Sequence, residues 1–264
     1  MTANSLYSNF VDAADDLGSI KQSKENLAYI SGLAGGIVRL DLVNELSAGA
    51  VYPFIGGTAH SHKFNFMNPV DSDAAKRLVF NGGGWIHDNN GIKPNGTSSI
   101  ANTFVTLTNS QRLNSTLAVN SFTDYKSANA TTNYAIDIGH GNTGDSINNL
   151  LLRYTDDLFY YDNRVVGFSS ALTSNSIGFY LGTLKDGFMR SYKNGLMLTN
   201  INNSLVSNTE ITDTITLSGR THTGSVCFSP RGLSFALIGL GILDVKVQRF
   251  SHLIKTLQNI KGRL

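Results

Sequence analysis

Four aromatic residues have the chemistry needed to bind sugars. The flat face of a Trp or Tyr ring complements the apolar face of a saccharide, so an exposed aromatic side chain can act as a stacking platform. Burial in a core is the competing interpretation, and it is the favoured one for Trp85. The candidate glycan-binding residues are Trp85, Tyr125, Tyr160 and Tyr161.

A set of polar residues in a Gly-rich stretch has the composition of a site for a hard cation. Calcium loops place several oxygen ligands in a tight turn, which this stretch can provide. The spacing does not match an EF-hand, and Asx turns explain the pattern equally well. The candidate metal ligands are Asp137, His140, Asn142 and Asp145, and calcium is the cofactor they suggest.

The motif His60-Ser61-His62 would place two imidazoles on one face of an extended strand, a spacing that some metal sites use. No acidic residue or third histidine lies nearby in the sequence. A surface or packing role is therefore the favoured interpretation of both histidines.

The sequence lacks the residue patterns of several enzyme classes. Glycoside hydrolysis needs two carboxylates about 5–9.5 Å apart, yet glutamate occurs only at Glu25, Glu45 and Glu210. There is no Gly-x-Ser-x-Gly elbow and no Gly-rich phosphate loop that ends in Lys-Ser/Thr. Cys227 is the single cysteine, which excludes an intrachain disulfide and a thiolate metal cage, and we expect it to be buried as a small hydrophobe. We predict that the chain is not an enzyme.

Charge and hydropathy exclude two further classes. The 264 residues carry a net charge of +2 and only 15% are charged, which is too balanced for a general nucleic-acid binder. The longest apolar stretch, residues 233–243, is about half as long as the roughly twenty residues that a membrane span requires. The N-terminus lacks the basic and apolar regions of a signal peptide. We therefore expect no nucleic-acid partner and no membrane partner.

The charges are unevenly placed along the chain. Acidic residues gather near the start and basic residues near the end, an arrangement typical of two solvated helix faces. The alternative is that one or both ends dock on an oppositely charged neighbour in an assembly. The residues concerned are Asp12, Asp15, Asp16 and Glu25 at the start, and Lys246, Arg249, Lys255, Lys261 and Arg263 at the end.

The spacing of apolar residues predicts helical ends and a β-rich middle. Residues 1–50 show a helical rhythm, with Ser23 as a candidate start and a glycine-weakened centre around residues 32–36. From Val51 onward, short strand candidates alternate with Gly/Asn turns, which is typical of a β-sandwich. Asn194-Gly195 predicts a type I′ hairpin. A last helix is expected from about Asp244, with Gly262 as its stop.

Three stretches together resemble a known family. They are residues 51–65 (VYPFIGGTAHSHKFN) with the Asn/Asp-rich segment that follows, the hairpin around Lys193-Asn194-Gly195, and residues 234–244 (SFALIGLGILD) leading to the terminal Gly262-Arg263-Leu264. These resemble structural proteins of tailed phages of Bacteroidota-type hosts, a group similar to the concanavalin A-like (laminin G-like) jelly-roll sandwiches. The resemblance implies an all-β jelly roll over residues 51–264, including the terminal helix, preceded by a helical anchoring segment over residues 1–50.

The same resemblance implies a bacteriophage virion protein assembled in the host cytoplasm and exposed on the particle. Its place would be a head fibre or capsid decoration, or a tail or receptor-binding component. The implied partners are other virion proteins, with a homo-oligomer and a host surface glycan as further partners. The alternative function is a free lectin-like domain that binds or cleaves carbohydrate.

Overall fold

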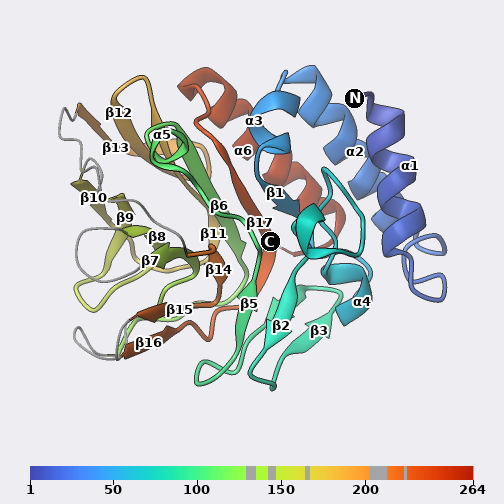
Figure 1. Ribbon diagram of the computed structural model, residues 1–264, viewed down its shortest axis with the longest axis horizontal. Coiled ribbons are helices and arrows are strands. Elements are labelled where there is room, and N and C mark those ends of the chain that lie inside the picture. Colours follow the sequence, from blue (N-terminus) through green and yellow to red (C-terminus); the bar gives the residue numbers. More distant parts are fainter. Residues whose placement is uncertain (129–134, 142–146, 164–166, 203–212, 223–224, 264) are drawn as a thin grey trace.

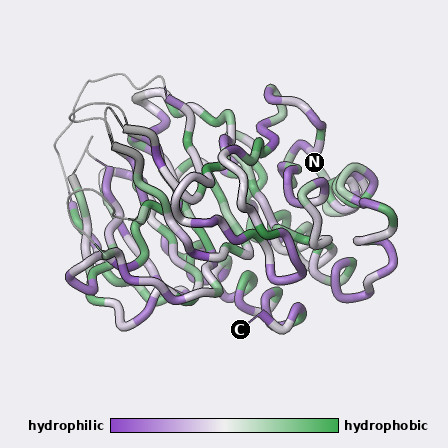
Figure 2. Tube along the Cα trace, turned by 90° about the horizontal axis from the view of Figure 1, so that it is seen from below, coloured by the Kyte–Doolittle hydropathy of each residue, from purple (hydrophilic) through white to green (hydrophobic). Residues whose placement is uncertain are grey.

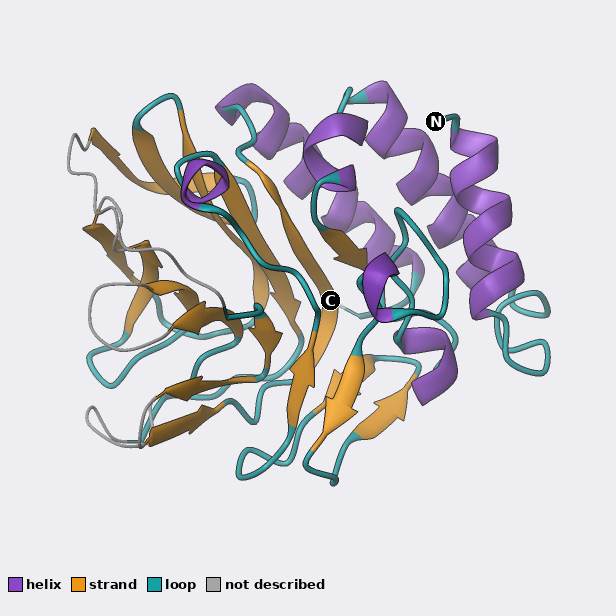
Figure 3. Ribbon diagram, viewed as in Figure 1, coloured by secondary structure: helices purple, strands orange, loops and turns teal. Residues whose placement is uncertain are grey.

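The chain folds into a β-sandwich with a helical layer on one side. The computed structural model describes residues 1–128, 135–141, 147–163, 167–202, 213–222 and 225–263. Two antiparallel sheets pack face to face, and helices from both ends of the chain cover the outer face of one of them (Figures 1 and 3). The predicted all-β sandwich with helical ends is confirmed.

Sheet A has the helices on one face and sheet B on the other. Its strand order is β13 (Leu196–Asn202), β12 (Phe188–Lys193), β11 (Gly178–Lys185), β6 (Ser115–Ser121), β17 (Leu233–Leu240), β4 (Gly91–Lys93) and β3 (Ile86–Asp88), and β1 (Ala50–Tyr52) also pairs with β17.

Sheet B and a small hairpin complete the β structure. The strand order of sheet B is β10 (Gly167–Leu172), β9 (Leu158–Asn163), β8 (Ile147–Leu151), β7 (Ile138–Gly141), β14 (Thr216–Leu217), β5 (Ile100–Asn102) and β2 (Val79–Asn81). The hairpin pairs β15 (Gly219–His222) with β16 (Ser225–Phe228).

The helices lie mainly at the two ends of the chain. They are α1 (Ala3–Ala14), α2 (Lys24–Arg39), α3 (Val43–Ser47), α4 (Ala59–His62), the 3₁₀ helix η1 (Asp73–Ala75), α5 (Asn109–Arg112) and α6 (Asp244–Ile260). Within the described residues, none of these helices is both long and apolar enough to cross a membrane.

Two apolar cores hold the layers together. One lies between the sheets and includes Leu117, Phe159 and Tyr180; the other lies between sheet A and the helices and includes Phe10 and Phe250. In Figure 2 the hydrophobic segments run through the interior and the hydrophilic ones mainly along the outer turns. The helical segment predicted for residues 1–50 therefore shares a core with the sandwich, and its anchoring role stays a prediction.

The central glycines of α2 serve helix packing. A Cβ added at Gly32 would lie 2.7 Å from Leu257 Cδ2, and one at Gly36 would collide with the side chain of Leu253. These two glycines, one turn apart, thus let α2 approach α6 closely. The helix begins where expected, because Ser23 Oγ accepts a hydrogen bond from the backbone N–H of Asn26 at 3.2 Å.

The Asn194-Gly195 hairpin is confirmed. Both residues have positive φ angles, 52° and 84°, as a type I′ turn requires. Asn194 Oδ1 also accepts a hydrogen bond from the backbone N–H of Phe179 at 2.9 Å, so the turn is bonded to the neighbouring strand as well.

The terminal helix ends as its sequence predicts. Gly262 has a φ of 63°, and the N–H groups of Gly262 and Arg263 donate to the carbonyls of Asn259 and Gln258 at 3.0 Å each, which is a Schellman cap. At the other end, Asp244 is the first helical residue and Leu243 occupies the N-cap position without a side-chain cap.

One local expectation is wrong. His60-Ser61-His62 lies in the short helix α4 rather than in a strand, because Thr58 and Ser61 form a capping box that starts a helical turn.

A buried ion pair joins distant parts of the sandwich. Arg231 and Asp137 are both fully buried, and Arg231 Nη1 donates to the two Asp137 oxygens at 2.7 and 3.0 Å. The rest of the guanidinium donates to the carbonyl oxygens of Tyr125 and Arg153. Ser229 Oγ and the backbone N–H of Leu152 also donate to Asp137. Both charges are thus surrounded by hydrogen-bond partners.

We predict that Arg231→Met destabilises the protein by about 3–5 kcal/mol, because it leaves a buried carboxylate without its cation. Urea unfolding measures the effect. Replacing both partners, as Arg231→Met with Asp137→Leu, should recover part of the loss. The control is Arg77→Met, which breaks surface pairs with the exposed carboxylates of Asp71 and Asp73 and should cost no more than about 1 kcal/mol for each pair. An equal cost at Arg231 and Arg77 would contradict the prediction.

Candidate functional site

The outer face of sheet B carries an aromatic cluster. Along β9 the side chains alternate, so that Phe159 and Tyr161 are buried while Tyr160 is half-exposed. On β10, Ser170 pairs with Tyr160, and Phe168 lies two residues further along the same face. Phe168 is 62% exposed. Tyr160 and Phe168 are therefore diagonal neighbours on a surface that faces solvent.

Three rings lie side by side in this cluster. The ring centroids of Tyr160 and Phe168 are 6.2 Å apart with the planes tilted by 45°, and those of Tyr154 and Tyr160 are 5.5 Å apart and nearly perpendicular. We call Tyr154, Tyr160 and Phe168 the aromatic face. Its apolar margin continues to Leu172, which is 79% exposed and pairs with Leu158.

A hydrogen bond fixes the central ring. Tyr160 Oη donates to Asp156 Oδ2 at 2.7 Å, and the backbone N–H of Leu158 donates to Asp156 Oδ1 at 3.1 Å. Burial, as the larger cause, and the hydrogen bond to Asp156, as the second cause, raise the pKa of Tyr160 to about 12. The phenol therefore stays neutral at ordinary pH. A held carboxylate next to apolar rings offers a hydrogen-bond acceptor beside a stacking surface.

The aromatic face rests on the β15–β16 hairpin. Cys227 is fully buried against Ile136 and Leu151, and Tyr154 and Tyr160 pack against this small cluster. The expectation that Cys227 is a buried hydrophobe is confirmed. The undersides of two of the three rings are thus supported.

The other predicted glycan-binding residues do not join Tyr160. Tyr161 is fully buried, its ring packed against Gly182 of sheet A, so it has no face to offer a sugar and the prediction for it is wrong. Tyr125 is half-buried, and its ring is covered by the Arg231 guanidinium at 5.4 Å. Trp85 is half-buried just before β3 in sheet A, packed edge-on against Phe80, and its Nε1 donates to Asn81.

Phe168 and Tyr154 were not expected from the sequence. Adjacent residues of a strand point to opposite faces. The sequence alone therefore indicated that only one of Tyr160 and Tyr161 could be exposed. Phe168 belongs to the segment Gly167–Leu172, whose mixture of small and apolar residues gives no alternating pattern.

Of the four predicted metal ligands, the structure describes Asp137 and His140. Both Asp137 oxygens are occupied by Arg231 and its neighbours, as described above, so a cation would have to displace the guanidinium. His140 is buried, and burial together with Arg112 and Arg220 lowers its pKa to about 3. The prediction for Asp137 is therefore wrong, and that for His140 stays a prediction.

The remaining predicted ligands, Asn142 and Asp145, lie outside the described residues. In the described ranges there is no group of three or more His, Cys, Asp or Glu residues that could hold a metal ion.

His62 pairs with a histidine from another element rather than with His60. Its Nε2 accepts from the backbone N–H of Gly57 at 3.2 Å, which leaves Nδ1 to donate to His87 Nδ1 at 3.1 Å. Burial lowers the pKa of His62, helped by the nearby charges of His87 and Arg263, and burial also lowers the pKa of His87. Both rings are therefore neutral and serve packing at the edge of the sandwich.

The comparisons with known proteins place the fold. The sequence matches no protein family and no curated protein. A mutant sialidase of Trypanosoma rangeli with trans-sialidase activity shares the fold at a TM-score of 0.50 and 11% identity, over 87% of this chain and 40% of the sialidase. The chain thus spans less than half the length of that enzyme.

Two smaller domains are more distantly similar. The CBM40 of the Ruminococcus gnavus IT-sialidase, bound to α2,3-sialyllactose, has a TM-score of 0.39 and 14% identity over 52% of this chain and 82% of its own. Domain 4 of the Geobacillus stearothermophilus arabinanase AbnA, in complex with arabinotriose, has a TM-score of 0.37 and 11% identity over 65% of this chain and 79% of its own. The sialidase likeness shows a shared β-sandwich fold.

The depressed pKa of His140 predicts a dependence of stability on pH. In the unfolded chain its pKa is roughly 6.5, so below that pH the unfolded state binds a proton that the folded state does not. The free energy of unfolding should then fall with decreasing pH, by about 1.4 kcal/mol per pH unit for each such histidine.

Urea unfolding between about pH 4 and pH 7 tests this. His140→Gln should reduce the proton uptake on unfolding by about one, whatever its effect on stability at neutral pH. His252→Gln, at an exposed position of α6, controls for the loss of a histidine. Parallel pH profiles of the wild type and His140→Gln would contradict the assignment.

Proposed function

We propose that the chain is a non-catalytic binding domain that contacts glycan through the aromatic face. The observation that carries the proposal is the row Tyr154–Tyr160–Phe168 on the outer face of sheet B, with centroid separations of 5.5 and 6.2 Å; Phe168 is exposed and the two tyrosines are half-buried. An exposed aromatic ring such as Phe168 offers an apolar face on which a sugar ring can stack, and the half-buried tyrosines extend this apolar surface. Asp156, held beside the central ring, supplies an acceptor for sugar hydroxyls.

The layer arrangement supports the same surface. The helices cover the outer face of sheet A, whereas in the described residues the β9–β10 side of sheet B has no helix packed on it (Figure 3). A sheet face with exposed Phe and Leu side chains is a typical interaction surface. The proposal therefore places the ligand on the side of the domain away from the helices.

We propose further that this domain is displayed on the particle of a tailed phage, as a head-fibre or decoration component or as a tail or receptor-binding component. The sequence resemblance of residues 51–65 and 234–244 supports this setting. The helical layer would then face the particle and sheet B the host surface. Quantitative mass spectrometry of purified particles tests whether the chain is part of the particle. A stoichiometric amount of the chain supports the proposal, and its absence from intact particles overturns it.

Binding to a glycan array tests the proposed ligand class. Phe168→Ala and Tyr160→Ala should each weaken binding by roughly 2- to 10-fold, the loss expected for one aromatic contact of about 0.5–1.5 kcal/mol. Phe188→Ala, at a half-buried Phe on β12 of sheet A, is the matched control and should bind as the wild type does.

Two results would overturn the glycan proposal. One is an array without signal above background; the other is binding that survives Phe168→Ala and Tyr160→Ala together. Release of reducing sugar from a bound polysaccharide would instead favour the alternative of a carbohydrate-cleaving domain.

A further inference from the structure

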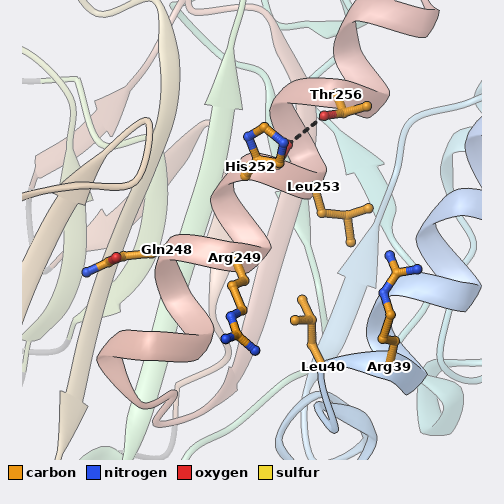
Figure 4. A pocket seen from close by; sticks show the side chains of 7 residues that line it. All are labelled: Arg39, Leu40, Gln248, Arg249, His252, Leu253 and Thr256. Atoms are coloured by element: carbon orange, nitrogen blue, oxygen red, sulfur yellow. Dashed lines mark hydrogen bonds between the residues drawn. The ribbon is translucent and has the colours of Figure 1, made fainter.

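A groove with two cationic walls lies between α2 and α6. It has a volume of about 620 Å³, and it is lined by Arg39 and Leu40 at the end of α2 and by Arg249, His252, Leu253 and Thr256 on α6, among others (Figure 4). Leu40 and Leu253 are partly buried and form an apolar floor. In Figure 4 the side chain of Leu40 lies between the two guanidinium groups. The groove thus offers an apolar contact flanked by positive charge.

The two arginines of the groove are available to a partner. Both are exposed, and in the described part of the chain neither Arg39 nor Arg249 forms an ion pair. The neighbouring Lys246 differs, because it is paired with Asp41 and Glu45 at 3.3 and 3.2 Å. Asp41 and Glu45 are thus already engaged by Lys246, and the two arginines fit an acidic partner with an apolar tip.

The turn between α1 and α2 has this chemistry. Leu17 is 99% exposed and is preceded by Asp15 and Asp16. The backbone N–H of Ser19 donates to the Asp16 carbonyl at 2.9 Å, and Leu17 and Gly18 have φ angles of 52° and 84°, as in a type I′ turn. The first central position of such a turn favours Asn, Asp or Gly.

A leucine at this position is unfavourable in two ways: its backbone is strained and its side chain is fully in water. The turn is nevertheless held firmly, because Asp15 Oδ1 accepts the backbone N–H groups of Ile20 and Lys21 at 2.8 and 2.9 Å. The Asp16 carboxylate has no partner in the described chain. This turn is fixed in place, and it presents the exposed Leu17 side chain beside the unpaired Asp16 carboxylate. These are the features of a contact surface.

We propose that the acidic turn Asp15–Gly18 of one copy of the chain docks in the α2–α6 groove of a second copy. Leu17 would contact Leu40 and Leu253, and Asp16 would face Arg39 and Arg249. The turn precedes α2 and the groove lies at the far end of that helix, about 24 Å away for sixteen residues. A copy therefore cannot fill its own groove (Figure 1).

The contact joins two different surfaces, so it is heterologous. Each copy keeps a free turn at one end and a free groove at the other, and further copies add head to tail. Such a contact gives a ring or an open chain rather than a symmetric dimer. Of the acidic residues near the start of the sequence and the basic residues near its end, Asp16 and Arg249 would then meet across this interface.

Sedimentation velocity of the full chain over a range of concentrations tests the proposal. The wild type should form larger species as its concentration rises, and less so at high salt, which screens the charges. Leu17→Asn and Arg249→Glu should each lower the association constant by about tenfold or more. Leu17→Asn should leave the unfolding midpoint unchanged or raise it, because Asn tolerates the positive φ.

Two variants control for charge and for apolar surface. Lys255→Glu makes the same charge change on an exposed residue of α6 outside the groove, and Val70→Asn removes an exposed apolar side chain elsewhere. Both should associate as the wild type does.

Mixing the two variants provides the decisive experiment. Leu17→Asn keeps an intact groove and Arg249→Glu keeps an intact turn, so an equal mixture should form pairs and nothing larger. A wild type that remains monomeric throughout, association that survives Leu17→Asn, or a mixture that forms no pairs would each overturn the proposal.

Discussion

The buried contact between Arg231 and Asp137 is the constraint on which the rest of the sandwich depends. A guanidinium in an apolar interior is tolerated only when its donors are satisfied. Here Arg231 donates to both oxygens of Asp137 and to the carbonyls of Tyr125 and Arg153. The pair therefore fixes the start of β7, the loop after β6 and the end of β8 relative to one another.

This contact also sets the position of the aromatic face. The Arg153 carbonyl that accepts from Arg231 immediately precedes Tyr154, and the side chain of Arg153 pairs with Asp124 and Asp157 around the same turn. The turn that carries Tyr154 is thereby held against the sandwich. Two consecutive residues, Arg153 and Tyr154, thus connect the buried ion pair to the aromatic face.

The helical layer decides which surfaces remain for interaction. Because α1, α2 and α6 bury the outer face of sheet A, the proposed glycan contact lies on the β9–β10 side of sheet B, and the proposed contact with a second copy lies at the ends of the helical layer. The glycines of α2 allow the close approach of α6, so they help shape the groove beside Leu253. The proposed glycan contact and the proposed self-association therefore use opposite sides of the domain and can operate together.

The sequence by itself determined the features that depend on neighbouring residues. The helical ends, the Asn194-Gly195 turn and the cap at Gly262 all follow from spacing, caps and positive φ. The tertiary structure alone decided which candidates could act. Tyr160 and Tyr161 are identical in type, and only packing against Gly182 buries one of them.

The same holds for the predicted metal site, because Asp137 meets its partner Arg231 across 94 residues of sequence. No local pattern reports such a contact. The free energy of a charge or an aromatic ring depends on what surrounds it in space, whereas turns and caps depend on bonds within a few residues. The sequence therefore determined where the elements lie, and the packing of distant segments determined their chemistry.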